Sequence, residues 1–121
     1  MVNAITWFEL PAADFDRAVT FYDSILATPL QRGEFFGHPH GFFPSDKTGV
    51  GGAVVLDPRL KPADTGTVVY LDCNGKLDDV IGRVEASGRK VLLPKTHIGD
   101  PGYIALVRDT EGNTVGLHSP A

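Results

Sequence analysis

The stretch from Asp14 to Leu26 has the sequence DFDRAVTFYDSIL, and it decides the fold of the first half of the chain. Its apolar residues recur at helical spacing: Phe15, Ala18, Val19, Tyr22, Ile25 and Leu26. They form one continuous stripe along about three turns of helix. Asp14 is of a type that caps a helix N-terminus, and Pro29 stops the helix from continuing. The stretch therefore predicts an amphipathic helix with one face in a core.

A second amphipathic helix is predicted in the other half, where apolar residues have the same spacing: Leu77, Val80, Ile81 and Val84. Gly88 is placed to end this helix. Runs rich in β-branched and aromatic residues predict strands at 5–10, 50–56, 67–73, 90–93, 103–108 and 114–118. We expect one or two more strands between residues 30 and 48, and a hairpin turn over 109–113. The predicted fold class is α+β.

The two halves of the chain repeat the same order of elements. The strand and helix of the first half recur roughly 62 residues later, although few residues are identical. Each half is predicted to run strand, helix, strand, strand, strand. The sequence therefore predicts a single domain over residues 1–121, with module one at about 1–60 and module two at about 64–121.

Composition excludes several classes of protein. A formal net charge of −4 with interspersed signs argues against nucleic acid or an anionic membrane surface as the main partner. No apolar run is long enough to span a membrane, and the first residues do not resemble a signal peptide. The single cysteine, Cys73, rules out an internal disulfide and a cysteine-based zinc cluster. We therefore expect a cytoplasmic protein.

Three segments carry a family resemblance: ITWFELP at 5–11, DFDRAVTFY at 14–22 and DTEGNTVGLH at 109–118. Together the sequence resembles the vicinal-oxygen-chelate superfamily, which includes glyoxalase I, bleomycin resistance proteins and extradiol dioxygenases. Within it, the likeness is greatest to small bacterial proteins described as predicted enzymes related to lactoylglutathione lyase. The resemblance covers essentially the whole chain. It implies two βαβββ modules whose curved mixed sheets form a cleft, and it implies a homodimer.

The resemblance also implies a divalent metal held by four His, Gln or Glu side chains. The first ligand position, seven residues before Asp14, is Trp7, whose indole nitrogen is a donor and cannot bind a cation. The position four residues after Gly112 is Gly116, which has no side chain. The counterpart of Trp7 on the fifth strand is Val68 or Tyr70. The counterpart of Gly116 lies near Val54 and is apolar.

We therefore predict no metal and no other cofactor. A relocated divalent metal site is the less favoured alternative. Glu9 and His118 each lie two residues beyond a lost ligand position, and oxygen and imidazole ligands suit Zn, Ni, Mn or Fe.

Strand alternation assigns candidate site residues to the cleft. Trp7 and Glu9 face the cleft from the first module, and Tyr70 and Asp72 face it from the second. Glu9 is the candidate catalytic residue, either as a general base or as an anchor for a ligand amine or hydroxyl. The alternative for Glu9 is a structural hydrogen bond, because an acid between apolar neighbours needs a partner if it is buried. Trp7 and Tyr70 either stack on a ligand or pack in the core.

His40 and His118 complete the candidate ligand-binding residues. The segment His38-Pro-His40 is expected to form a loop beside the mouth of the cleft, and His97 to lie in a loop that covers it. Cys73 is expected to face the helix as an inert buried thiol.

Two functional hypotheses follow. In the first, the protein is related to glyoxalase and binds a small organic molecule, with lyase or isomerase chemistry based on Glu9 but without ordinary glyoxalase I activity. In the second, it is a metal-free protein that sequesters a small molecule, as its bleomycin-resistance relatives do.

Overall fold

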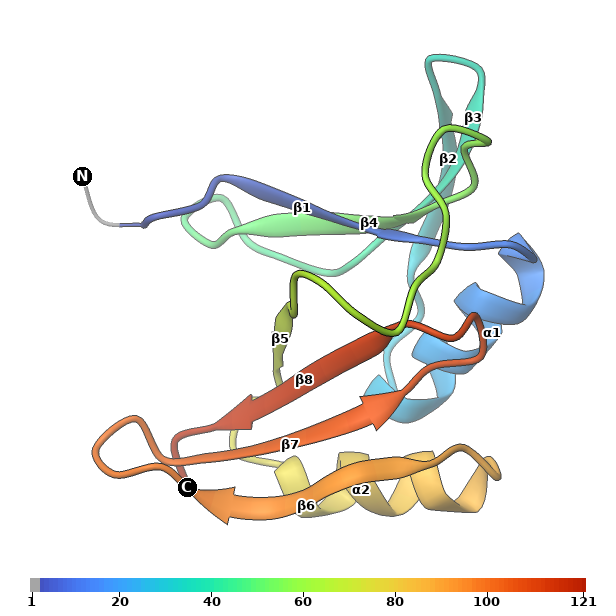
Figure 1. Ribbon diagram of the computed structural model, residues 1–121. Coiled ribbons are helices and arrows are strands. Elements are labelled where there is room, and N and C mark those ends of the chain that lie inside the picture. The colour runs from blue at the N-terminus through green and yellow to red at the C-terminus, as the bar shows by residue number, and fades with distance from the viewer. Residues whose placement is uncertain (1–2) are drawn as a thin grey trace. The chain divides into compact units, whose positions relative to one another are not determined.

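The computed structural model describes residues 3–121 and divides the chain into two compact units, the first ending at Pro62 and the second beginning at Ala63. Each unit contains one helix and one four-stranded mixed sheet (Figure 1). Each follows the order strand, helix, strand, strand, strand. The predicted α+β fold of two βαβββ modules is therefore confirmed.

The first unit consists of β1 (Trp7–Pro11), α1 (Phe15–Leu26), β2 (Gln31–Phe35), β3 (His38–Phe42) and β4 (Gly51–Val55). Its sheet has the order β1-β4-β3-β2. The β1 and β4 strands are parallel, while β2, β3 and β4 pair in antiparallel fashion. The strand β2 is therefore at one edge of the sheet, and β1 is at the other.

The predicted helix forms as α1, with Asp14 as its N-cap. The Asp14 carboxylate accepts a hydrogen bond from the backbone N–H of Arg17 at 3.1 Å, which satisfies one of the free N–H groups of the first turn. The helix ends at Ala27, where the backbone turns left-handed with φ of 54°. Four residues of the predicted stripe are buried, Ala18, Val19, Tyr22 and Ile25, together with Phe21, which the spacing did not predict. Phe15 and Leu26, at the two ends of the stripe, are half-buried.

The second unit consists of β5 (Tyr70–Asp72), α2 (Leu77–Ala86), β6 (Val91–His97), β7 (Tyr103–Arg108) and β8 (Thr114–Ser119), with the sheet order β5-β8-β7-β6. Figure 1 shows α2 running alongside β6. At the end of α2, the N–H of Gly88 bonds the carbonyl of Glu85, and the N–H of Arg89 bonds that of Val84. Gly88 has φ of +81°, so this is a Schellman cap with glycine at the predicted place.

Three local predictions differ from the structure. The segment His38-Pro-His40 is in a strand, because β3 forms a hairpin with β2. His97 is the last residue of β6 and pairs with Tyr103, so it is not in a loop. The predicted strand 67–73 is reduced to Tyr70–Asp72, the residues that pair with β8.

Neither of the two helices in residues 3–121 is long and apolar enough to cross a membrane.

Candidate functional site

A cavity of about 570 Å³ opens on the first unit. Its walls come from β1, from the β2–β3 hairpin, and from β4 with the turn that follows it. The lining residues are Trp7, Glu9, Phe35, Phe36, His38, His40, Phe42, Val55, Asp57 and Arg59. Aromatic rings and ionisable groups make up nearly all of this lining, so the cavity combines apolar walls with a few polar contacts.

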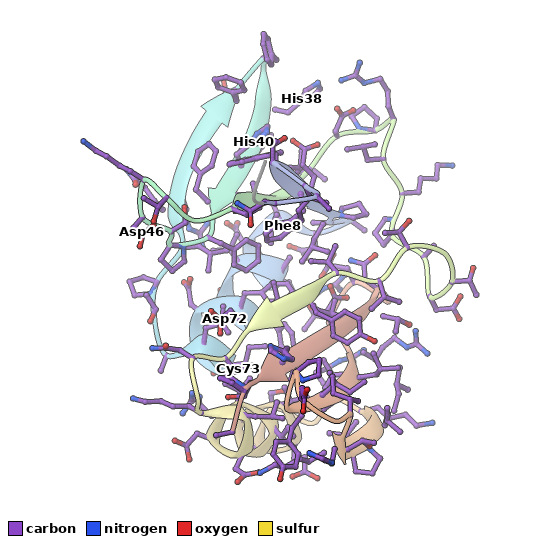
Figure 2. All side chains as sticks on the ribbon, turned by 90° about the vertical axis from the view of Figure 1, so that its left-hand side faces the viewer. Phe8, His38, His40, Asp46, Asp72 and Cys73 are labelled. Atoms are coloured by element: carbon purple, nitrogen blue, oxygen red, sulfur yellow. The ribbon has the colours of Figure 1, made fainter. Side chains whose placement is uncertain are left out.

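Strand β3 places its side chains on alternate faces of the sheet. His38, His40 and Phe42 line the cavity. Figure 2 labels the two histidines on β3. Gly41 lies between them on the opposite face, where a Cβ atom would be 2.8 Å from Cγ2 of Val19 in α1. The alternation therefore gives the cavity two imidazoles and a phenyl ring, while leaving room for the helix behind the sheet.

The same alternation holds in β1. Trp7 and Glu9 line the cavity, while Phe8 contacts Phe43 with ring centroids 5.4 Å apart. Phe43 in turn contacts Tyr22 of α1, so Phe8 is on the side of the sheet that packs against the helix. These are the two faces that strand alternation predicts for β1.

The aromatic walls of the cavity contact one another. The rings of Trp7 and Phe42 have centroids 6.2 Å apart and are tilted by 57°. The imidazole of His40 stacks on Phe42 at 5.6 Å with an angle of 27°, and Phe35 meets the same imidazole edge-on at 5.8 Å. Because each ring restricts its neighbour, these walls are preformed before a ligand enters.

Glu9 lies beside Trp7 and His40. The indole Nε1–H of Trp7 donates a hydrogen bond to Oε2 of Glu9 at 3.3 Å, and Nε2 of His40 lies 3.9 Å from the same oxygen. The side chain of Glu9 is 39% exposed. Glu9 therefore contacts protein groups and also has access to solvent. It is not a buried acid that lacks a partner.

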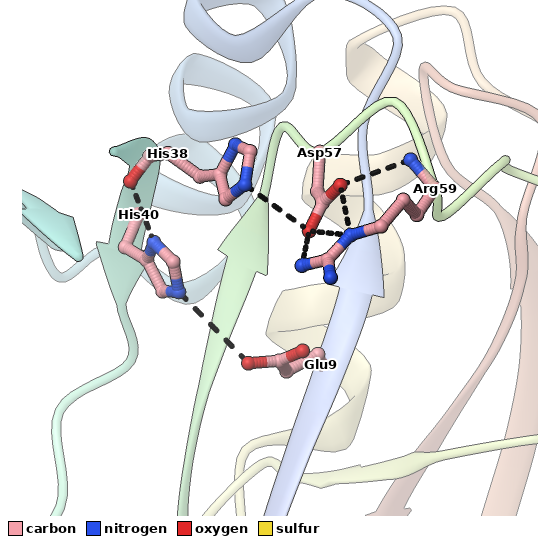
Figure 3. A network of polar contacts seen from close by, with 5 residues as sticks. All are labelled: Glu9, His38, His40, Asp57 and Arg59. Atoms are coloured by element: carbon pink, nitrogen blue, oxygen red, sulfur yellow. Dashed lines mark hydrogen bonds and ion pairs between the residues drawn. The ribbon is translucent and has the colours of Figure 1, made fainter. Parts of the chain in front are cut away.

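Asp57 is at the centre of a second set of polar contacts, with Arg59 and His38 (Figure 3). Its side chain is 5% exposed. Its carboxylate accepts hydrogen bonds from the backbone N–H of Arg59 at 2.9 Å and from Nη2 of the Arg59 guanidinium at 2.7 Å. Nε2 of His38 lies 3.6 Å away. The hydrogen bonds from the Arg59 side chain and backbone hold the pKa of Asp57 well below its usual range. Asp57 is therefore a carboxylate at neutral pH, and its charge is matched by Arg59.

The other candidate residues lie together on one face of the second sheet. Tyr70 pairs with Gly116, and Asp72 pairs with His118. Nε2 of His118 lies 2.6 Å from the carbonyl oxygen of Pro101 and donates to it. Tyr70, Asp72 and His118 are not among the residues that line the cavity, whereas Trp7, Glu9 and His40 are.

The residues at the expected metal positions do not fit a metal ion. In each unit an aromatic ring covers a glycine of the neighbouring parallel strand. A Cβ atom on Gly51 would lie 2.9 Å from the ring of Trp7, and one on Gly116 would lie 2.3 Å from the ring of Tyr70. Of these residues, Trp7 and Gly116 stand at expected metal positions, and neither an indole N–H nor a residue without a side chain offers a side-chain lone pair to a cation. Within residues 3–121, no group of three or more His, Cys, Asp or Glu side chains is arranged to hold a metal ion.

Solved structures similar to this one share a single fold. A glyoxylase/bleomycin resistance protein/dioxygenase domain from Frankia sp. EAN1pec superimposes with a TM-score of 0.71 at 17% identity, covering 100% of this chain and 94% of the other. The vicinal-oxygen-chelate fold is present in this chain. The fosfomycin resistance protein FosX from Listeria monocytogenes gives a TM-score of 0.70 at 14% identity, with the same coverage of 100% and 94%.

A third structure, from the mobile metagenome of V. Pseudocholerae, gives a TM-score of 0.64 at 18% identity and covers 100% of this chain and 97% of that one. A FosX variant has also been solved in complex with Mn(II) and 1S,2S-dihydroxypropylphosphonic acid. At these identities the likeness establishes the fold alone. No model of a known protein family and no curated protein matches the sequence.

Several residues of the cavity are not predicted from the sequence. Asp57 and Arg59 belong to an Asp-Pro-Arg turn after β4, and the carboxylate bonds its own turn. Phe35 and Phe36 form the tip of the β2–β3 hairpin, where Phe36 has φ of 51° and Gly37 has φ of 78°. The Phe-Phe-Gly sequence and the alternation of His38, His40 and Phe42 are the signals that could have revealed this hairpin.

Proposed function

We propose that this protein binds a small organic molecule in the cavity of its first unit. The observation that carries the proposal is a cavity of about 570 Å³ with mutually packed aromatic walls. Small-molecule sites are mostly apolar clefts of roughly 300–1,000 Å³ with a few oriented polar groups. The exposed edge of the Trp7 indole and the carboxylate of Glu9 supply such a combination.

The proposal requires no metal ion. The ligand would be held by ring contacts and hydrogen bonds, as in a protein of the bleomycin-resistance type that sequesters its ligand. Metal analysis of protein purified without chelator tests whether the site is free of metal. Stoichiometric Zn, Ni, Mn or Fe would contradict it.

One observation favours a second function, a lyase or isomerase. A carboxylate and an imidazole within 3.9 Å of each other can act as base and acid on one substrate, with Glu9 removing a proton and His40 supplying one when its Nε2 atom is also protonated. The 39% exposure of Glu9 leaves the carboxylate accessible to a substrate in the cavity. Sequestration and catalysis are distinguished by whether a bound ligand is recovered unchanged after incubation with the protein.

Ligand binding can be measured through Trp7, the single tryptophan of the chain. Small planar compounds such as indole and 1-naphthol should cause a saturable change in its fluorescence. The Phe42→Leu variant should weaken this binding, because Phe42 forms the wall beside Trp7. The matched control is Phe15→Leu, which removes a ring from α1 that does not line the cavity. Equal weakening by both variants, or no response in the parent protein, would contradict the proposal.

We also propose that the protein forms a homodimer. The edge strand β2 supports this, because all five of its residues are exposed in the single chain and their backbone groups can pair with a second copy. Sedimentation equilibrium tests the assembly, and a monomer at micromolar concentrations would contradict it.

A further inference from the structure

The imidazole of His40 presents a lone pair toward Glu9. Its Nδ1 atom lies 2.8 Å from the carbonyl oxygen of His38. A carbonyl oxygen accepts and does not donate, so Nδ1 must carry a hydrogen. When the ring has a single proton, that proton is therefore on Nδ1, and Nε2 is an acceptor. Nε2 lies 3.9 Å from Oε2 of Glu9, the oxygen that also accepts the Trp7 N–H, so two acceptor atoms face each other with no hydrogen shared between them.

The charge of Glu9 is not matched by a cationic side chain within residues 3–121. Its contacts there are the indole N–H of Trp7 and the imidazole of His40, and both are to Oε2. The other carboxylate oxygen, Oε1, makes no hydrogen bond to this part of the chain. A partly exposed carboxylate with an unused oxygen attracts a ligand that carries N–H donors and a positive charge.

The remaining charges of the cavity balance one another. The Asp57 carboxylate is paired with the Arg59 guanidinium at 2.7 Å. His38 and His40 add no charge while each carries one proton, so the cavity has a net charge of −1 from Glu9. The faces of Trp7 and Phe42 add the negative potential of aromatic rings, which attracts cations.

We infer that the ligand of this cavity is an organic cation with N–H donors, such as an ammonium or amidinium group on an aromatic or apolar body. Its N–H groups donate to Glu9 and to Nε2 of His40, which fills the gap between the two acceptors. Its apolar body lies against Trp7 and Phe42. This inference rests on the proposed function, since it assigns a chemical class to the ligand of the same cavity.

Benzylamine, benzyl alcohol and benzoate provide a matched series of probes that differ mainly in charge. Each is titrated at about pH 8, with Trp7 fluorescence as the readout. Benzylamine should bind about tenfold more tightly than benzyl alcohol because of its charge-assisted hydrogen bonds, and benzoate should bind most weakly. Benzyltrimethylammonium keeps the charge but has no N–H group, so it should bind more weakly than benzylamine. Equal binding of these two cations would overturn the donor role of the N–H groups.

The variant Glu9→Gln should reduce benzylamine affinity to that of benzyl alcohol, with little change in the affinity for benzyl alcohol itself. Glu34→Gln is the matched control: Glu34 is an exposed acid of β2 that does not line the cavity, and its loss should leave both affinities unchanged. Equal weakening by the two variants would overturn the assignment to Glu9. If benzyl alcohol binds as tightly as benzylamine, the cation inference fails while the proposed function stands. If no probe binds, both fail.

Discussion

The indole of Trp7 covers Gly51 of the neighbouring parallel strand, so closely that a Cβ atom on that glycine would lie 2.9 Å from Cζ3 of the ring. Tyr70 covers Gly116 in the same way in the second unit. In both units, therefore, an aromatic residue from the first strand occupies the space above a glycine of the last strand. In each unit these paired positions therefore present an aromatic ring beside a residue that has no side chain.

Gly51→Ala is expected to move the Trp7 ring without unfolding the protein. The added methyl group meets one edge of an indole that is 46% exposed, so the ring can shift toward solvent to make room, and it lies 3.2 Å from Oγ of Ser45. The free energy of unfolding should therefore change by less than about 1 kcal/mol. The emission maximum of Trp7 should shift, and ligands that quench its fluorescence should bind severalfold more weakly.

The control for this change is Gly82→Ala, in the exposed middle of α2, where a Cβ atom has no other atom within 4 Å. Alanine is favoured over glycine inside a helix, so the variant should be more stable by about 0.5–1 kcal/mol. Its tryptophan emission should match that of the parent protein. A shift of the same size in both variants would disprove the direct contact between Gly51 and Trp7.

Gly41→Ala should have a much larger effect on stability. Its Cβ atom would lie 2.8 Å from Cγ2 of Val19, a residue with no exposed surface, and 3.4 Å from Cδ2 of Leu30. Overpacking of this kind costs about 1–3 kcal/mol, which urea unfolding will measure. Val19→Ala removes the atom that clashes. The double variant should therefore lose less unfolding free energy than the sum of the losses of the two single variants. Strictly additive losses would show that the clash is absent.

Much of the fold could be predicted because local signals and the tertiary structure agree. The Asp14 cap, the apolar stripe of α1 and the glycine cap of α2 each depend on neighbouring residues, and all three form as expected. The β2–β3 hairpin is different. Its glycines and prolines obscure the strand pattern, and its strands are stabilised by pairing partners that sequence periodicity does not show.

The candidate site was harder to predict for a related reason. Alternation along β1 assigned Trp7 and Glu9 to one face, which needs no knowledge of other strands. Phe42 and Val55 join them through the register of β3 and β4, where Phe42 pairs with Ala53 and His40 with Val55. Register of this kind is a property of the folded sheet. A residue that enters the cavity from a turn, such as Arg59, has no periodic signal at all.

The Cys73 thiol should react slowly with alkylating reagents in the folded protein. It is 4% exposed, and burial raises its pKa to about 11 from an ordinary value of 9.0. At pH 8 its thiolate fraction is therefore roughly a hundredfold lower than in the unfolded chain, and the thiolate is the reactive form. Iodoacetamide labelling followed by mass spectrometry will measure the rate of Cys73 modification in the folded protein and in about 8 M urea, which unfolds small domains. Comparable rates in the two conditions would contradict the burial of Cys73.

Asp57→Asn should destabilise the protein at neutral pH and make its stability less sensitive to acid. The hydrogen bonds from Arg59 lower the pKa of Asp57 from its ordinary value of 3.8, so the folded state favours the carboxylate. A group with a depressed pKa stabilises the fold above its unfolded pKa, and this contribution is lost as the pH falls below that value. The difference in urea midpoint between parent and variant should therefore be largest near pH 7 and shrink progressively below pH 3.8. A difference that stays constant over this range would show that Asp57 acts through packing, and that its bonds to Arg59 do not select the charged form.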